Sequence, residues 1–267
     1  MATRYETLTI ERIGKEIAVV RLNRPDRFNA MTMTMFDELV EFPKELNKND
    51  DLRAVILTGA GKYFCAGFDL AEIDEMFEMD VRAFLTFQEK AVAGMMAMRT
   101  MRVPVIAAVN GAAAGGGFAL ALHADIRLAS PRAVFNAAFV KIGLSCGELG
   151  TSWLLPRMIG LSRAAEILYT ARNVGADEAE RMGLVSHIYP EETLLDEAIA
   201  MAKVIATNSP GGIQISKRAL QASQEAGSMA AAIEMENRGQ TLLSRGEDFR
   251  EGINAVREKR PAKYTGR

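Results

Sequence analysis

The run from Val105 to Leu122 constrains the fold of this chain more than any other segment. Its residues are nearly all small or apolar, and its length would be enough for a membrane span. However, Asn110 and a cluster of glycines interrupt the run, and alanine supplies most of its apolar character. We therefore interpret it as a buried strand over 104–109, a tight turn, and a buried helix over 116–123.

Strand and helix patterns alternate along residues 17–190. Residues 5–12 and 17–22 alternate in polarity and are joined by Gly14-Lys15-Glu16, which predicts a hairpin. Later strands are predicted over 53–57, 104–109 and 126–129, and helices over 32–47, 70–78, 81–101 and 116–123. This alternation predicts an α/β fold with parallel strands.

From Glu191 onward the pattern is helical and the strand signal disappears. The predicted helices cover 191–206, 210–226, 228–244 and 247–259. We therefore expect two parts, a core over residues 1–198 and a helical region over residues 199–267. A helical region with so little strand around it is expected to pack on the core or on another subunit.

The composition favours a globular protein with a large core. The chain has 267 residues, 49% of them hydrophobic, and a net charge of −2, so no basic field favours nucleic acid as a partner. Only Cys65 and Cys146 are cysteines, which favours a reducing compartment. The first residues have no apolar stretch of the kind found in signal peptides. We therefore expect a cytoplasmic location and no membrane partner.

The glycines at 115–117 stand between a predicted strand and a predicted helix. Backbone N–H groups at a helix start have no intrahelical acceptor and lie at the positive end of the helix dipole, so they suit a developing oxyanion. The same glycines would also allow close strand–helix packing. The cluster alone leaves both interpretations open.

A second glycine-containing loop, Thr58 to Leu70, also follows a strand and precedes a helix. Its Gly59-Ala60-Gly61 lacks the third glycine of a dinucleotide-binding loop, because residue 64 is Phe. A phosphate-binding P-loop would need glycine at Ile56 and a Ser or Thr at Tyr63. The spacing therefore excludes both nucleotide-binding loops.

Five segments follow one another in a fixed order along nearly the whole chain. They are Asn23-Arg24-Pro25 to Asn29-Ala30, Phe64-Cys65-Ala66-Gly67-Phe68-Asp69, Pro104 to Gly111 with Gly115-Gly116-Gly117, Ala176 to Val185, and Glu258-Lys259-Arg260. Together they resemble the "NRP-x-x-x-NA", "F-x-AG-x-D", "PVIAAVNG…GGG", "A-x-E-A…GLV" and "EKR" segments of the enoyl-CoA hydratase/isomerase (crotonase) superfamily.

The resemblance implies an α/β fold of the crotonase type, a spiral of ββα units with a C-terminal α-helical trimerisation region. It implies an acyl-CoA or enoyl-CoA substrate, no cofactor beyond the CoA moiety of that substrate, and a homotrimer or a dimer of trimers. In this family two backbone N–H groups hold the thioester oxygen, and here they belong to Phe68 and Gly116. The CoA would be bound by Arg27, by the backbone near Ala66, and by Lys259 of a neighbouring subunit.

The chain departs from the family at the two glutamates with which hydratases hold water. Ala119 and Phe139 stand at those positions, and neither can activate water. The nearest acid is Glu148, in a segment where isomerases of the family place a carboxylate. We expect double-bond isomerisation with Glu148 as acid and base. A hydratase with a non-standard acid/base and a CoA-ester-binding protein without turnover are the alternatives, and Glu148 could also be a helix-start acid or an ion-pair partner.

A further alternative is a serine hydrolase. Gly143 to Gly147 matches the G-x-S-x-G motif with Ser145 as nucleophile, and Asp177 and His187 follow in hydrolase order. The strand before the motif is weak, which makes this alternative less favoured. His123 is interpreted as a packed helix residue and Cys146 as a small buried filler. The two histidines lack metal-ligand spacing, so no metal site is predicted.

Overall fold

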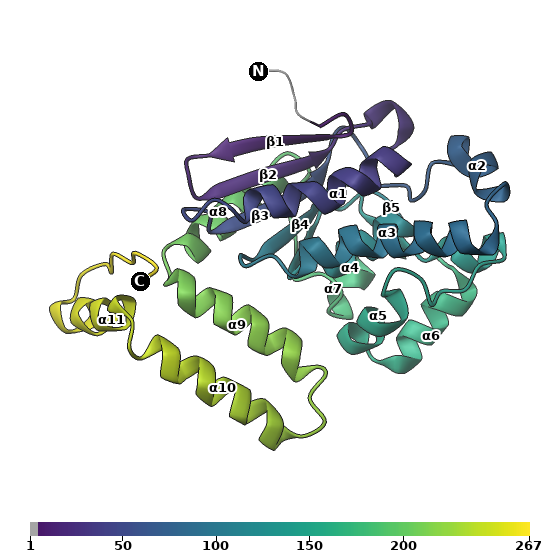
Figure 1. The fold of residues 1–267 in the computed structure, drawn as a ribbon. Coiled ribbons are helices and arrows are strands. Elements are labelled where there is room, and N and C mark those ends of the chain that lie inside the picture. Colours follow the sequence, from purple (N-terminus) through teal and green to yellow (C-terminus); the bar gives the residue numbers. More distant parts are fainter. Residues whose placement is uncertain (1–4) are drawn as a thin grey trace.

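A computed structural model describes residues 5–267 and contains two sheets with helices on both sides of the larger one (Figure 1). The larger sheet has the order β1-β2-β3-β4-β6-β9, in which β1 and β2 form the predicted antiparallel hairpin and the other pairs are parallel. The smaller sheet has the order β5-β7-β8. The α/β architecture predicted from the sequence is therefore confirmed.

The strands are β1 Leu8–Ile13, β2 Ile17–Leu22, β3 Ala54–Gly59, β4 Val105–Val109, β5 Ala113–Ala114, β6 Ile126–Ala129, β7 Val134–Asn136, β8 Val174–Gly175 and β9 His187–Ile188. The α-helices are α1 Met33–Leu46, α2 Ile73–Phe77, α3 Val81–Arg99, α4 Gly116–His123, α5 Thr151–Ile159, α6 Leu161–Thr170, α7 Ala176–Arg181, α8 Leu194–Ala206, α9 Pro210–Ser223, α10 Met229–Leu243 and α11 Glu247–Glu258. Short 3-10 helices occur at η1 Pro25–Arg27, η2 Leu70–Glu72 and η3 Ala138–Ile142.

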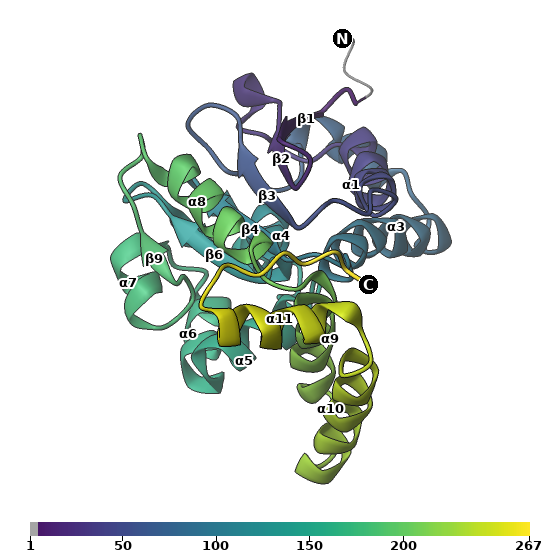
Figure 2. The same ribbon diagram turned by 90° about the vertical axis from the view of Figure 1, so that its left-hand side faces the viewer.

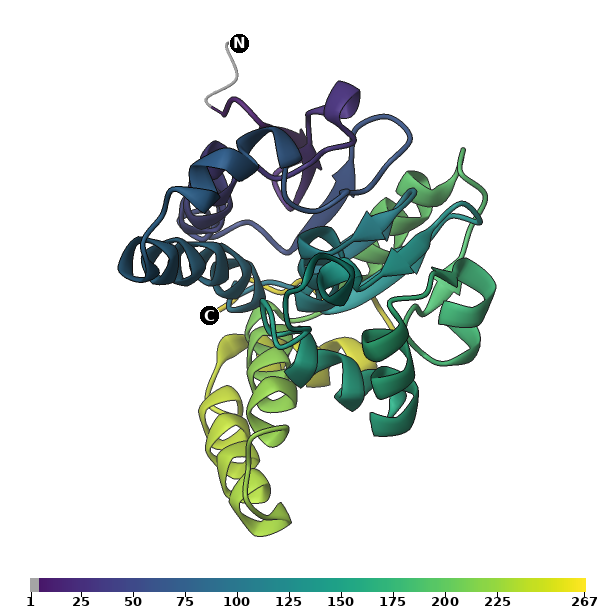
Figure 3. The same ribbon diagram turned by 90° about the vertical axis from the view of Figure 1, so that its right-hand side faces the viewer.

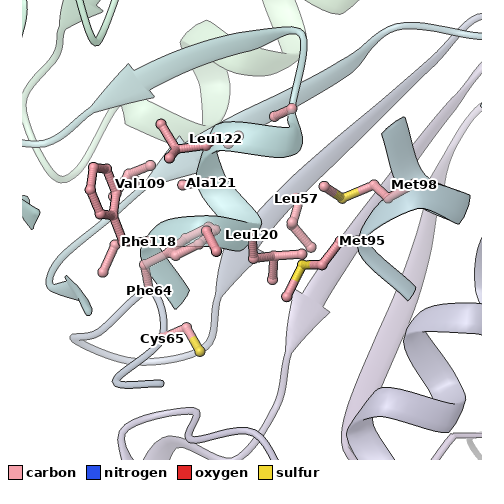
Figure 4. Close-up of a cluster of buried hydrophobic side chains, with 14 of the residues drawn as sticks. Leu57, Phe64, Cys65, Met95, Met98, Val109, Phe118, Leu120, Ala121 and Leu122 are labelled. Carbon is pink, nitrogen blue, oxygen red and sulfur yellow. The ribbon is translucent and has the colours of Figure 1, made fainter. Parts of the chain in front are cut away.

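Helices cover both faces of the central strands, which explains why β3 and β4 are continuous apolar runs. On one face, α1, α3 and α4 contribute to the main core (Figure 3). Figure 4 shows the side chains around α4, where Phe118, Leu120 and Leu122 lie among core residues that include Leu57 of β3 and Met95 of α3. On the other face, α8 packs on the sheet through a smaller cluster that includes Leu194, Ala198 and Ala202 (Figure 2).

The boundary expected at residue 198 falls inside α8, which belongs to the core because its apolar side packs on the sheet. The helices that extend from the core are α9, α10 and α11, and α9 and α10 run side by side below the sheet (Figure 1). Pro210 is the first residue of α9, a position that proline favours, and it marks the break between α8 and α9.

Helices α5 and α6 were not predicted. Pro156 lies inside α5, and Gly160, with a left-handed φ of 85°, separates α5 from α6. Proline and glycine both weaken a helical pattern in the sequence. Among the described residues, no helix is both long and apolar enough to cross a membrane.

Candidate active site

The two glycine-containing loops meet at one edge of the central sheet. Strands β3 and β4 are parallel, with Thr58 opposite Ala108, so the loops that follow them leave the sheet side by side. The Asn110 amide donates to the carbonyl oxygen of Gly59 at 3.1 Å and accepts from the Gly59 N–H at 3.1 Å. The Asn29 amide donates to the carbonyl oxygens of Ala60 and Tyr63 at 2.9 and 2.7 Å. The motif asparagines therefore tie the first and third segments to the loop that runs from Thr58 to Leu70.

Close backbone packing accounts for part of the glycine cluster. A β-carbon on Gly117 would lie 2.2 Å from the carbonyl oxygen of Cys65, and one on Gly111 would lie 2.0 Å from that of Lys62. No side chain fits at these distances. For Gly111 and Gly117 the packing interpretation is therefore sufficient.

Gly116 has a different environment. A β-carbon there would meet side chains, with Met31 Sδ at 3.1 Å and Leu149 Cδ1 at 3.6 Å. Gly116 is the first residue of α4, so its N–H has no acceptor within the helix. Within residues 5–267 this N–H donates to no backbone carbonyl. It is a bare donor at the positive end of a helix.

Backbone hydrogen bonds between Met31 and the Gly67–Asp69 segment orient the Phe68 N–H away from Met31. The Met31 N–H donates to the carbonyl oxygen of Gly67 at 2.7 Å, and the Asp69 N–H donates to that of Met31 at 2.8 Å. Because the peptide between Gly67 and Phe68 is trans, the Phe68 N–H points opposite to the Gly67 carbonyl. Among the described residues it also has no backbone acceptor.

Gly67 brings these two donors together. It has a φ of 95°, and a β-carbon on it would lie 3.5 Å from the Gly116 nitrogen. The fold thus places the residue before Phe68 against the nitrogen of Gly116. Two unpaired donors on adjacent backbone segments form an arrangement that suits a developing oxyanion.

The Phe68 side chain belongs to an aromatic cluster. Its ring lies 6.4 Å from that of Phe36 on α1 and 5.8 Å from that of Phe87 on α3, centroid to centroid. Phe84 extends the cluster at 6.0 Å from Phe87. The Phe68 ring therefore forms a bulky wall next to the Phe68 N–H, and side chains from two helices anchor it.

Glu148 is half-buried near Gly116. The next residue, Leu149, places its Cδ1 atom against Gly116, and the Gln88 side chain of α3 lies close enough to influence the pKa of the Glu148 carboxyl. Burial raises the pKa of Glu148, an effect that the Gln88 side chain partly offsets. None of the ion pairs among the described residues involves this carboxyl, contrary to one of the alternatives from the sequence.

The positions of the usual hydratase glutamates are apolar and buried. Ala119 lies on the first turn of α4, and its N–H donates to the carbonyl oxygen of Gly115. The Phe139 ring lies on η3, with its Cε1 atom 3.8 Å from the position of a β-carbon on Gly115. Both therefore border the glycine turn without offering a group that could hold water.

The predicted CoA-binding residues fall into two places. Arg27 is exposed on η1, and the carbonyl oxygen of the next residue, Phe28, accepts a hydrogen bond from Ala66 N–H at 3.1 Å. Arg27 and Ala66 therefore lie on adjacent segments beside the candidate site. Lys259 is exposed at the end of α11. Figure 1 places α11 across the molecule from α2, the helix that follows the loop containing Ala66. Within one chain, Lys259 is not brought to the other two residues.

The serine-hydrolase alternative is not supported by the local geometry. Ser145 follows the 3-10 helix η3, whereas a nucleophile elbow follows a strand. Its Oγ accepts from the Gly147 N–H at 3.0 Å, and no hydrogen bond within residues 5–267 joins it to a histidine. Cys146 is buried, and its Sγ lies 3.1 Å from the carbonyl oxygen of Leu168, which agrees with a packed filler.

Comparison with known proteins decides the family. The family model for enoyl-CoA hydratase/isomerase matches residues 12–267. The chain belongs to the enoyl-CoA hydratase/isomerase family. It is 41% identical to a probable enoyl-CoA hydratase of Mycobacterium leprae over 92% of this chain and 85% of that protein. It is 34% identical to the 1,2-epoxyphenylacetyl-CoA isomerase of Escherichia coli over 97% of this chain and 98% of that protein.

Solved structures agree with this membership. An enoyl-CoA hydratase from Bacillus anthracis superposes with a TM-score of 0.92 at 31% identity, covering 98% of this chain and all of that one. The resemblance inferred from the five segments and the crotonase fold are therefore both confirmed. This protein is an enzyme of the enoyl-CoA hydratase/isomerase family.

Several residues around the site of this family member were not found from the sequence. Met31 and Leu149 border Gly116, and Gln88 reaches Glu148 from α3. Met31 directly follows the Asn23 to Ala30 segment and Leu149 directly follows Glu148, which is a weak signal. Gln88 had no signal at all, because nothing in its helix distinguishes it from a solvent-facing glutamine.

Proposed function

We propose that this enzyme isomerises the double bond of an enoyl-CoA thioester and that Glu148 carries the proton. One observation carries the proposal: Leu149, the residue after the half-buried Glu148, packs against Gly116, while Ala119 and Phe139 leave the hydratase positions without an acid. Isomerisation needs one positioned base, whereas hydration also needs an activated water.

The chemistry follows from the two bare donors. The thioester oxygen accepts hydrogen bonds from the N–H groups of Phe68 and Gly116, which stabilise the negative charge that develops when a proton leaves the α-carbon. Glu148 takes that proton and returns it to the γ-carbon, so the double bond moves and no net proton is lost. Burial raises the pKa of Glu148 and makes its carboxylate a stronger base.

The CoA portion is proposed to lie along Arg27 and the backbone of Ala66, with Lys259 reaching it from a neighbouring subunit. This arrangement requires a homo-oligomer, a trimer or a dimer of trimers. It requires no cofactor beyond the CoA of the substrate. We expect the enzyme to act in the cytoplasm.

The decisive experiment compares two reactions. The purified enzyme is given 3-enoyl-CoA and 2-enoyl-CoA, and both conversions are followed by mass spectrometry. We expect isomerisation of 3-enoyl-CoA to be the faster reaction, and we expect Glu148→Gln to reduce it at least about a hundredfold without abolishing CoA-ester binding. Glu89→Gln, an exposed glutamate on the same helix as Gln88, is the matched control and should retain activity.

A second candidate is a hydratase that uses a different acid/base. The name of the Mycobacterium leprae relative, with its 41% identity, favours this candidate. Rapid hydration of 2-enoyl-CoA that survives Glu148→Gln would establish it and overturn the isomerase proposal. Binding of acyl-CoA with no conversion of either substrate would instead support a CoA-ester-binding protein without turnover.

A further inference from the structure

His123 ends α4, the helix that begins with Gly116. It is 3% exposed, and its Nε2 lies 2.9 Å from the carbonyl oxygen of Leu149. A carbonyl oxygen only accepts, so Nε2 carries the proton and donates. Side chains on a helix lean toward its N-terminus, which directs the imidazole back along α4 toward the turn after Glu148.

The turn that His123 contacts has an unusual backbone. Leu149 has a φ of 48° and Gly150 a φ of 76°, and the Thr151 N–H donates to the carbonyl oxygen of Glu148 at 2.8 Å. A left-handed leucine is strained and persists only where its surroundings impose it. Two contacts from α4 do so: the His123 hydrogen bond to the Leu149 carbonyl, and the packing of Leu149 Cδ1 on Gly116, 3.6 Å from where a β-carbon would be.

The imidazole also fills the space beside the turn. A β-carbon on Gly150 would lie 3.1 Å from His123 Nε2, so the ring packs against the backbone of the residue that precedes α5. The turn thus contacts α4 twice, through the imidazole of His123 and through the Leu149 side chain on Gly116. Glu148 is the residue that enters this turn.

We propose that His123 is a positioning residue that fixes the Glu148 carboxyl relative to the Gly116 N–H. This inference rests on the proposed function, because it concerns the same acid and the same donor. Helix α4 then positions both parts of the site. Its first residue, Gly116, supplies the N–H donor, and its last residue, His123, supports the turn that carries the base. The acid is held relative to the oxyanion donor because the turn that follows Glu148 contacts the helix that carries Gly116.

The protonation of His123 fits this role. Burial is the main cause that lowers its pKa to about 4, the Leu149 carbonyl opposes this effect, and the charge of Arg99 adds to it. The ring is therefore neutral at neutral pH, and Nδ1 has no hydrogen-bond partner within the described residues. A neutral ring with the proton on Nε2 is sufficient to hold the Leu149 carbonyl.

The test uses three substitutions at this position in the full-length enzyme. His123→Gln retains an N–H donor at a similar reach, His123→Met fills similar volume without a donor, and His123→Phe keeps a flat ring without a donor. Turnover of 3-enoyl-CoA and the Kd for a non-reacting acyl-CoA are measured for each, and circular dichroism checks that each is folded. His123→Phe replaces His123→Met if the latter does not fold.

We expect His123→Met to lower kcat about tenfold to a hundredfold, since small displacements of a catalytic group have effects of this size. The Kd should change less than about twofold, and His123→Gln should restore most of kcat. In a Glu148→Gln background, His123→Met should cause no further loss, because the group that it positions is gone.

Three results would overturn the inference: full kcat in both His123→Met and His123→Phe, a His123→Gln variant as impaired as His123→Met, or an equal loss in the Glu148→Gln background. The last result would show that His123 supports the fold in general. The same variants also test the proposed function separately from the positioning role. If Glu148→Gln alone keeps wild-type turnover, the proposed base is wrong and the positioning role falls with it. If Glu148→Gln is inactive while the His123 variants are normal, only the positioning role is lost.

Discussion

The carbonyl oxygen of Ala114 lies 2.9 Å from the position that a β-carbon on Gly67 would occupy. This contact sets the distance between the loop that carries the Phe68 N–H and the turn that carries the Gly116 N–H. Any side chain at residue 67 would push the two loops apart.

Gly67→Ala is therefore expected to impair the oxyanion donors. Alanine would meet the Ala114 carbonyl and would also have to adopt a φ of 95°, so we expect a loss of about 1–3 kcal/mol in stability. Separation of the two donors should lower kcat about a hundredfold. Steady-state kinetics and thermal unfolding measure the two effects.

The control is Gly227→Ala, where a β-carbon would have no neighbour within 4 Å and φ is not left-handed. That variant should behave like the wild type. A folded Gly67→Ala enzyme with normal kcat would show that the two donors do not act together.

Asp69 should stabilise the fold in a pH-dependent way. Arg24 Nη1 lies 2.7 Å from its carboxylate, and the Ala71 N–H donates to the same group. Burial raises the pKa of Asp69, but the hydrogen bonds from Ala71 and Arg24 and the charges of Arg24 and Arg27 lower it more, so the net shift is downward. The ionised form is thus favoured in the folded state.

Because the folded-state pKa is depressed, this stabilisation is complete above the unfolded-state pKa of about 4 and disappears as the pH falls through the folded-state pKa. Asp69→Asn should cost about 2 kcal/mol in the free energy of unfolding at pH 7, and less in acid. Urea unfolding at several pH values measures the difference. Asp177→Asn, at an exposed aspartate, is the control, and a pH-independent cost at Asp69 would contradict the ion-pair explanation.

Glu148 should have the opposite effect on stability. Its pKa is raised by burial, so the protonated form is favoured in the folded state. The stabilisation from that proton is present below the unfolded-state pKa and is lost as the pH rises through the folded-state pKa. Glu148→Gln should therefore be more stable than the wild type at neutral pH, and the difference should vanish in acid.

Thermal unfolding at pH 4 and pH 7 measures this difference for Glu148→Gln, with Glu89→Gln as the exposed control. Equal stability of wild type and Glu148→Gln at pH 7 would mean that the carboxyl is well solvated. Such a carboxyl would be a weaker base than proposed.

Lys259 offers a test of assembly and CoA binding together. If it reaches a CoA phosphate of a neighbouring subunit, Lys259→Ala should weaken CoA binding about fivefold, the size expected of one exposed charge pair. The effect should be larger at low salt, where charges are screened less. Isothermal titration with CoA at two salt concentrations, together with analytical ultracentrifugation, measures both properties. Lys203→Ala is the control, and a monomeric wild type with unchanged CoA affinity in Lys259→Ala would count against the arrangement.

The sequence by itself determined the elements with strong local signals. The strand at Ile126–Ala129 and the helix at Gly116–His123 have the predicted bounds, because alternation of small apolar runs with glycine turns is a local property. The order of the five motif segments was enough to indicate the family that the comparisons confirm.

Only the tertiary structure decided which glycine allows close packing and which one supplies a free N–H donor. Gly116 and Gly117 are identical in sequence terms, yet Gly117 packs against the Cys65 carbonyl while Gly116 faces side chains and keeps a free N–H. The difference arises because the parallel register of β3 and β4 determines where the loop containing Cys65 passes. Likewise, Gln88 reaches Glu148 and His123 holds Leu149 only because α3 and α4 pack on the same face of the sheet. Contacts between residues so distant in the chain depend on packing, and no local pattern encodes them.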